Sequence, residues 1–239
     1  MRRAFTTCTA LAVVLALGLT ASAVAKFLQT ATVSLTAHRA GQTTGMVVRL
    51  SAADPTALGA KPKALRSLRI SFPAHTKFNL GTSSARACRL TDKQLTTAFG
   101  PRCPRASQIG TGTAVANLNP LQAVVNAPVR AYIRGDRQLI LFVTPKLPGA
   151  TPIIIPATVS GSTLSVRVPR LVYGQSSKPK FAGVTGVLVA LKLTVPAMGA
   201  GPTALISAGR CTAHEFAVTS RFTYADHSRL TLHSKSRCR

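Results

Sequence analysis

Short runs in which apolar and polar residues alternate are the feature that most restricts what this chain can fold into. In Thr30–His38, the apolar residues Ala31, Val33, Leu35 and Ala37 occupy every second position. Because successive side chains of a strand point to opposite faces, this spacing predicts a β-strand with one buried face. The pattern recurs at Met46–Ala52, Ser67–Phe72, Pro128–Arg134, Arg137–Thr144, Ile153–Ser160, Thr163–Val168, Glu215–Tyr224 and Arg229–Ser234.

The connections between these runs indicate how the strands are joined. Turn signals lie at Gly135-Asp136, near Gly161 and near Ala225–Ser228. Many short strands joined by such turns predict an all-β fold, and we expect a two-sheet sandwich of jelly-roll type. One further run, Gly186–Val195, is expected to place five apolar residues on one face: Val187, Val189, Leu191, Leu193 and Val195.

A single helix is expected in this β-rich chain. The segment Thr91-Asp92-Lys93-Gln94 has the form of a capping box, in which the first and last side chains satisfy each other's backbone amides. Leu95 and Phe99 follow at helical spacing, and a Gly-Pro pair ends the pattern. These signals predict one short helix near residues 91–99.

The first 25 residues have the layout of a secretory signal peptide. Arg2-Arg3 supplies a positive start, Leu11–Leu19 an apolar stretch, and Ala23-Val24-Ala25 a cleavage signal. The arginine pair leaves both general and twin-arginine export open. We therefore expect residues 26–239 to form a single secreted or cell-surface domain, with no transmembrane segment.

The charge of the chain is strongly positive. The sequence has 30 lysines and arginines against five acidic residues, which gives a formal net charge of +25. Outside the cell, the partners that such a charge attracts are anionic envelope polymers, acidic polysaccharides and lipid headgroups, and we do not expect nucleic acid there. A basic surface without a dedicated ligand is the alternative.

Four cysteines remain after the expected cleavage, namely Cys88, Cys103, Cys211 and Cys238. Four cysteines allow three disulfide connectivities, and proximity along the chain favours Cys88–Cys103 and Cys211–Cys238. The spacings Cys211-x2-His214 and His233-x4-Cys238 also suit zinc, although thiols of exported proteins usually oxidise. We therefore expect two disulfides and no metal or cofactor.

Local disulfides would gather arginines. The first bond would collect Arg86, Arg89, Arg102 and Arg105, and the second Arg210, Arg237 and Arg239. Like charges held together are stabilised by an anion, so these two groups are the candidate anion-binding residues. The alternative is that the same side chains simply point into water.

Two segments carry a resemblance. Cys103-Pro104-x-x-Ser107-x-Ile109-Gly110-x-Gly112 resembles a CPxxSxIGxG element of uncharacterised secreted β-sandwich proteins of actinobacteria, in which a second cysteine precedes a short helix. Phe222-Thr223-Tyr224-Ala225-Asp226 before a closing cysteine is similar to the ending of that group, whose pattern often has Gly in place of His227. The resemblance implies an extracellular β-sandwich and carries no activity.

Catalytic signals are sparse. The acidic residues fall in or beside expected turns and caps, where Asp is usually structural: Asp54, Asp92, Asp136, Glu215 and Asp226. There is no Gly-x-Ser-x-Gly elbow, and His214-Glu215 lacks the second histidine of a His-Glu-x-x-His motif. The chain has no Trp and three Tyr, which weakens a sugar-binding interpretation.

The sequence therefore predicts a non-enzymatic secreted β-sandwich that associates electrostatically with an anionic envelope or extracellular polymer. Two alternatives stay open. One is a secreted hydrolase in which His214, Glu215, Asp226 or His227 meets a serine or cysteine. The other is a carbohydrate-binding module with exposed Tyr132, Tyr173 or Tyr224.

Overall fold

The structure, a computed structural model, describes residues 28–53, 62–81, 87–97, 102–119, 123–146, 152–173 and 184–239. The strands within these ranges are β1 (Leu28–Leu35), β2 (Met46–Ala53), β3 (Leu65–Ser71), β4 (Lys77–Phe78), β5 (Gln108–Asn119), β6 (Ala123–Gly135), β7 (Gln138–Val143), β8 (Ile153–Ser160), β9 (Thr163–Arg167), β10 (Leu171–Tyr173), β11 (Val184–Val195), β12 (Ile206–Ser207), β13 (Glu215–Tyr224) and β14 (Arg229–Arg237). The α-helix is α1 (Asp92–Thr97), and short 3-10 turns lie at Arg105–Ser107 and Gly201–Thr203.

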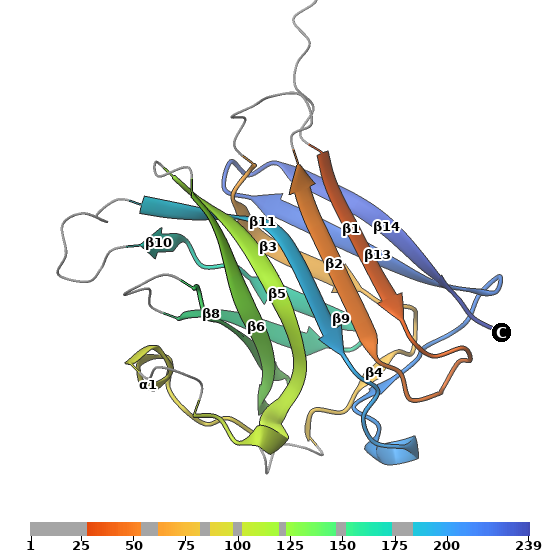
Figure 1. The fold of residues 1–239 in the computed structure, drawn as a ribbon. Coiled ribbons are helices and arrows are strands. Elements are labelled where there is room, and N and C mark those ends of the chain that lie inside the picture. The colour runs from red at the N-terminus through yellow and green to blue at the C-terminus, as the bar shows by residue number, and fades with distance from the viewer. Residues whose placement is uncertain are drawn as a thin grey trace, which may run out of the picture.

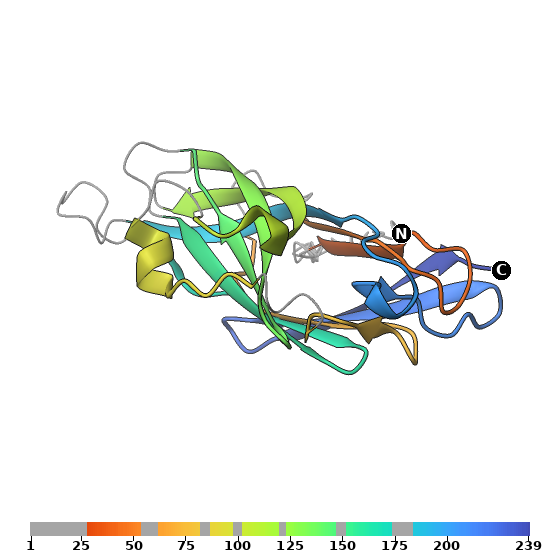
Figure 2. The ribbon, with the colours of Figure 1, turned by 90° about the horizontal axis from the view of Figure 1, so that it is seen from below.

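Most of these strands belong to one continuous antiparallel sheet. Its order is β1-β2-β11-β5-β6-β7-β8-β9-β3-β13-β14, with β10 paired to β11, while β4 and β12 form a separate small pair. Figure 1, and Figure 2 in the view from below, show the sheet bending so that β1, β2, β11 and β5 form one wall and β3, β9, β13 and β14 form the other. The all-β prediction is therefore confirmed.

The two ends of the sheet meet through serine side chains. The hydroxyl of Ser234 on β14 accepts from the Val33 amide of β1 at 3.1 Å and donates to the Val33 carbonyl at 3.0 Å. Ser236 accepts from the Leu35 amide at 3.4 Å. These bonds replace a backbone ladder along the seam and leave the sheet nearly closed, like a barrel. The expected division into two separate sheets is not confirmed.

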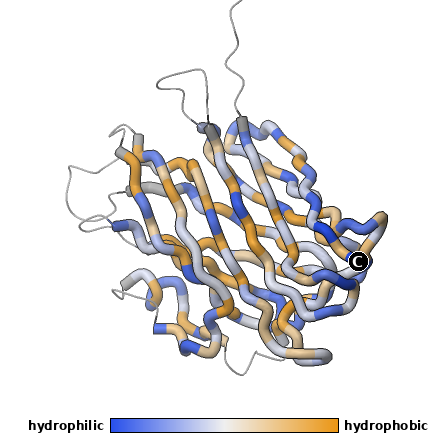
Figure 3. Tube along the Cα trace, turned by 45° about the vertical axis from the view of Figure 1, so that its right-hand side comes forward, coloured by the Kyte–Doolittle hydropathy of each residue, from blue (hydrophilic) through white to orange (hydrophobic). Residues whose placement is uncertain are grey.

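The interior follows from the alternation read in the sequence. On β13, Phe216, Val218, Ser220 and Phe222 are fully buried, and the alternate residues Ala217, Thr219 and Arg221 face outward. Val33, Leu35 and Ala37 are buried as predicted for the first strand. Figure 3 shows the resulting alternation of hydrophobic and hydrophilic residues along the strands. Burial of this one face is the main source of stability for such a sheet.

The prediction for β11 is wrong in part. The pairing of β11 with β5 shifts between Leu188 and Ala190, which marks a β-bulge. A bulge inserts one extra residue, so the side chains before it change face relative to those after it. Leu188 therefore faces the interior together with Leu191 and Leu193, although the uninterrupted alternation had placed Val187 and Val189 there.

The helix prediction is confirmed over the residues the structure describes; Phe99 lies outside them. The Gln94 amide donates to Oγ1 of Thr91 at 3.3 Å, and the Thr91 amide donates to Oε1 of Gln94 at 2.8 Å, which completes the capping box. Leu95 is fully buried in a second hydrophobic cluster with Cys88, Tyr132, Ile140 and Phe142. The helix therefore covers the outer face of β6 and β7.

The CPxxSxIGxG element has a structural explanation. Ser107 is fully buried, and its Oγ donates to the carbonyl of Pro104 at 2.6 Å, which closes the short turn before β5. Ile109 enters the core. A Cβ atom at Gly112 would overlap the carbonyl oxygen of Lys192, so glycine permits the close approach of β5 to β11. The element therefore forms the turn that leads into β5 and allows β5 to pack closely against β11.

One sequence-based expectation falls on a segment that the structure does not describe. The signal peptide expected at residues 1–25 lies outside the described residues. Within the described ranges, the helices fall short of the length and apolar character needed to cross a membrane.

Candidate anion-binding surface

Five exposed arginines lie on the outer side of the wall formed by β9, β3, β13 and β14. They come from four neighbouring segments of the sheet, and we call them the arginine face: Arg66, Arg69, Arg167, Arg221 and Arg229. The strand alternation explains the direction of Arg69 and Arg221, because Leu68, Ile70 and Phe222 beside them are buried. Arg66 departs from the alternation, and it lies where the pairing of β3 with β13 shifts. Serine and threonine occupy most of the other outward positions on these strands.

The register of the strands fixes the pattern of the arginine face. Arg69 on β3 lies directly opposite Arg221 on β13. Two residues along, the cross-strand row reads Arg167, Ser67, Thr223, Arg229 from β9 to β14. Directly opposed Cβ atoms are about 4.5–5.5 Å apart and diagonal ones about 7–8 Å. Arg167 and Arg229 are thus diagonal neighbours of the central pair.

Within the part of the chain that the structure describes, no ion pair neutralises this positive charge. The ion pairs within the described residues are Lys63–Asp226, Arg134–Asp92 and Lys235–Glu215, and none of them includes a residue of the arginine face. Like charges directly opposite each other on neighbouring strands destabilise a sheet. An anion bound across Arg69 and Arg221 would relieve this repulsion, and guanidinium groups suit carboxylate and phosphate oxygens.

The opposite wall carries a smaller basic pair. Arg49 on β2 lies opposite Lys192 on β11, and both are exposed. The outward residues beside them in the same row are Thr32 and Thr113. This pair repeats the opposed charges of Arg69 and Arg221 without the diagonal arginines, so it provides an internal comparison.

The arginines predicted around the first disulfide are only partly gathered. Cys88 and Cys103 are bonded, with their Cα atoms 4.9 Å apart, which brings the adjacent Arg89 and Arg102 toward each other. Arg89, Arg102 and Arg105 are all exposed, and Arg86 lies outside the described residues. The only acid of the neighbouring helix, Asp92, is paired with Arg134 at 2.6 Å.

The second disulfide gathers the C-terminal arginines. Cys211 and Cys238 are bonded with a Cα separation of 6.0 Å, so exposed Arg210, Arg237 and Arg239 flank one bond. Both disulfides therefore have the pairing favoured by proximity. Figure 1 places α1 and the C-terminus on opposite sides of the molecule, so the two groups predicted from the sequence do not form one surface.

The structure also bears on the zinc and hydrolase alternatives. The disulfide occupies both sulfur atoms that the zinc spacing required, and no cluster of metal-ligating side chains is found in the ranges described. His214-Glu215 begins β13, whereas Asp226-His227 follows its end. Since a strand rises about 3.3 Å per residue, ten residues separate the two pairs by about 30 Å. These four residues do not converge on one cleft.

The aromatic residues are not presented as a sugar-binding platform. Tyr132 and Tyr224 are 2% and 3% exposed, and the side chain of Tyr173 lies outside the described part of the chain. Tyr132 packs beneath α1, and Tyr224 belongs to the main core. Burial therefore leaves neither of these two rings available to stack on a sugar.

Sequence reasoning missed the arginine face because its strands are far apart in the chain. A local signal was present, since Arg69 lies between the buried apolar residues Leu68 and Ile70 and must face outward. Arg221 lies likewise between two buried residues, Ser220 and Phe222. The opposition of the two arginines depends on the pairing of β3 with β13, which no local pattern specifies.

Comparisons of the chain with protein-family models, with curated proteins and with solved structures found no match.

Proposed function

We propose that this chain is an exported, non-enzymatic protein that associates electrostatically with an anionic polymer of the cell envelope or the extracellular space. The arginine face is its principal contact surface in this proposal. The observation that carries it is the direct opposition of Arg69 and Arg221, with Arg167 and Arg229 on the diagonals and no acidic partner in the described residues.

Export is part of the proposal. The signal-like start of the sequence and the two disulfides support it, because disulfides form and persist in oxidising compartments. The sequence resemblance to secreted actinobacterial proteins points the same way. In that setting, polymers with repeated carboxylate or phosphate groups are the most abundant partners for a chain with a net charge of +25.

The shape of the surface favours an extended polymer over a small anion. The row from Arg167 to Arg229 spans four strands, or about 14 Å at the usual spacing between strands. The serines and threonines between the arginines offer hydroxyl groups to the same ligand. Several weak charge contacts made at once would give binding that falls steeply as salt rises.

The test compares two double variants with the same change in charge. Arg69→Gln/Arg221→Gln removes the centre of the arginine face, and Arg49→Gln/Lys192→Gln removes the matched pair on the opposite wall. Residues 26–239 and both variants are passed over immobilised alginate, a carboxylate polymer, and over wall teichoic acid, a phosphate polymer. Neutral dextran is the control matrix, and the measured quantity is the salt concentration at elution.

We expect the arginine-face variant to elute at clearly lower salt than the unmodified chain, and the opposite-wall variant to change little. Equal shifts in both variants would mean that net charge alone controls retention and would overturn the assignment of the surface. No retention on either polymer at low salt would overturn the proposed function. A third variant, Arg89→Gln/Arg102→Gln/Arg105→Gln, measures the contribution of the first disulfide group.

A further inference from the structure

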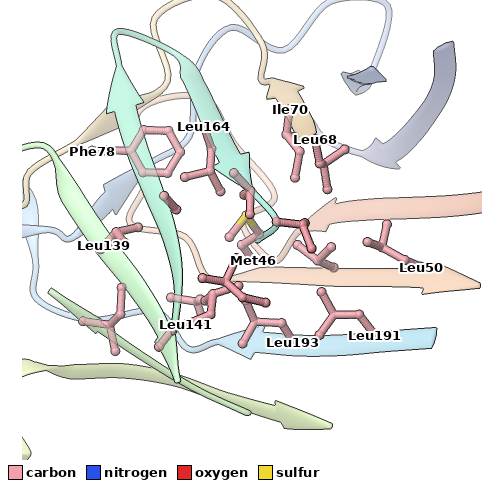
Figure 4. Close-up of a pocket in the computed structure, with 18 of the residues that line it drawn as sticks. Met46, Leu50, Leu68, Ile70, Phe78, Leu139, Leu141, Leu164, Leu191 and Leu193 are labelled. Carbon is pink, nitrogen blue, oxygen red and sulfur yellow. The ribbon is translucent and has the colours of Figure 1, made fainter. Parts of the chain in front are cut away.

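The space between the two walls contains apolar cavities. One has a volume of about 60 Å³ and a second about 40 Å³, and they share five lining residues: Leu141, Ile155, Val168, Leu188 and Leu191. Figure 4 shows side chains of both walls, among them Met46 and Leu193 of one wall and Leu68 of the other, pointing into the larger cavity. Each volume exceeds the roughly 10–15 Å³ that one water molecule needs.

The lining makes these cavities suited to hydrocarbon. Every residue that lines them has an apolar side chain, and most are leucine, isoleucine, valine or alanine. A buried water needs two to four polar partners, whereas apolar cavities stay dry and accept apolar guests. The cavities are therefore sites where an aliphatic group gains free energy by leaving water.

Coverage of the larger cavity is uneven. Ile70, Leu80 and Ala131 are 1–2% exposed, so that part of the lining is closed to solvent. Leu65 and Val168 are only half-buried, as are Leu188 and Leu191. The less covered end is thus where β3 begins and β9 ends, and a ligand would enter there.

Three exposed arginines lie at this less covered end. Arg66 follows Leu65, and Arg167 and Arg170 lie on either side of Val168 in sequence. The Val168 amide donates to the Arg66 carbonyl at 2.9 Å, so these backbone segments are in direct contact. Guanidinium groups at the entrance of an apolar cavity match a ligand with an anionic head and an aliphatic tail.

We infer that the interior of the sheet binds an anionic amphiphile with a single alkyl chain. The alkyl chain would occupy the two neighbouring cavities, and the carboxylate or phosphate head would contact Arg66, Arg167 and Arg170. The lipid source is either a free fatty acid or a phosphate-headed lipid, since both offer this chemistry. The inference shares Arg66 and Arg167 with the arginine face, but it places the alkyl chain in the interior and does not depend on the central pair Arg69 and Arg221.

The experiment measures binding of defined probes to residues 26–239 by titration calorimetry, with methyl NMR to locate the site. Butanoate, hexanoate, octanoate and decanoate form a chain-length series; octyl phosphate tests the phosphate head and octanol the uncharged one. We expect affinity to rise about fourfold for each added methylene until the cavities are filled. Octanol should bind more weakly than the anions at low salt. Tighter binding of octanoate would identify a fatty acid as the ligand, and tighter binding of octyl phosphate would identify a phosphate-headed lipid.

Matched variants test the location. Ala157 lines the larger cavity, so Ala157→Leu should fill it and reduce octanoate affinity at least tenfold. Ala217→Leu makes the same change on the exposed face of β13 and should leave affinity unchanged. Arg66→Gln/Arg167→Gln/Arg170→Gln should lower affinity for octanoate but not for octanol. Near-ultraviolet circular dichroism confirms folding, and Leu191→Phe provides a second filled interior if Ala157→Leu misfolds.

Absence of saturable binding by every probe would overturn the inference. It would also fail if affinity did not depend on chain length, or if the filled variants bound octanoate as the unmodified chain does. The Arg69→Gln/Arg221→Gln variant should retain alkyl binding while eluting from the polymers at lower salt, so failure of one proposal is distinguishable from failure of the other.

Discussion

Nζ of Lys63 lies 2.8 Å from Oδ2 of Asp226, and this ion pair links the segment before β3 to the turn between β13 and β14. The other carboxylate oxygen of Asp226 accepts bonds from the backbone amide and the hydroxyl of Ser228, at 3.0 and 2.6 Å. The bonds from Lys63 and Ser228 hold the pKa of Asp226 well below its ordinary value.

This low pKa predicts an acid-dependent contribution to stability. Because the folded state favours the carboxylate, the contribution is complete above the ordinary Asp pKa of 3.8 and declines as pH falls toward the lower folded value. In urea unfolding at neutral pH, Asp226→Asn should have a lower free energy of unfolding than the unmodified chain, and this difference should shrink in acid. Asp136→Asn, in the turn between β6 and β7, is the control. A difference that stays constant with pH would contradict the prediction.

Tyr224 should give the opposite dependence at alkaline pH. Burial, together with the nearby Asp226 carboxylate, raises the pKa of Tyr224 to about 12 from 10.0. The unfolded chain therefore loses this proton first, and stability falls as pH rises between these values. Relative to Tyr224→Phe, the free energy of unfolding of the unmodified chain should fall by about 2–3 kcal/mol between these two pH values, since one pKa unit corresponds to about 1.4 kcal/mol. Parallel pH curves for the two chains would disprove this.

The opposition of Arg69 and Arg221 predicts a variant that is more stable than the natural sequence. Arg221→Thr removes one of two like charges that face each other across β3 and β13. We expect a gain of about 0.2–1 kcal/mol at low ionic strength, which decreases as salt shortens the Debye length to about 10 Å at 0.1 M. Arg39→Thr, at an exposed turn, changes net charge equally and should gain less. Urea unfolding at two salt concentrations measures both, and an equal gain would assign the effect to net charge.

The sequence was sufficient for those features that local patterns determine. The strands around Gly135-Asp136 and Gly161, the final hairpin and the capping box at Thr91 are all present. Each of these depends on residues within a few positions of one another, so local periodicity and turn chemistry specify them. Proximity along the chain also gave the pairing of both disulfides.

The features that could not be predicted from the sequence depend on contacts between distant segments. The seam in which Ser234 bonds to Val33 joins residues 201 positions apart, and it turns an expected pair of sheets into one nearly closed sheet. The opposition of Arg69 and Arg221 depends in the same way on strand order. His227 has a φ of 64°, in the left-handed region that favours glycine, and the resembling group often has Gly at this position. A histidine in the sequence gave no sign of this backbone conformation.

Leu95 predicts how much the helix contributes to stability. Its side chain is fully buried against Tyr132, Ile140 and Phe142, although α1 has only six residues. Leu95→Ala should therefore cost about 2–5 kcal/mol, as buried leucine truncations usually do. Lys93→Ala, on the exposed side of the same helix, should stay within about 0.5 kcal/mol. Urea unfolding measures both variants, and similar costs would show that helix propensity and not burial is responsible.

Gly112 on β5 and Gly135 at the end of β6 predict alanine substitutions whose effects on stability have opposite signs. A Cβ atom at Gly112 would overlap the carbonyl oxygen of Lys192 and lie 2.9 Å from Cα of Leu193, so Gly112→Ala must push β5 away from β11. We expect a loss of about 1–3 kcal/mol or more, as for other overpacked positions. At Gly135 the nearest atom to such a Cβ is 4.0 Å away, so Gly135→Ala should be neutral or stabilise by about 0.4–1 kcal/mol through the unfolded chain. Thermal unfolding of both variants checks the prediction, because a tolerated Gly112→Ala would mean that β5 and β11 are not in close contact.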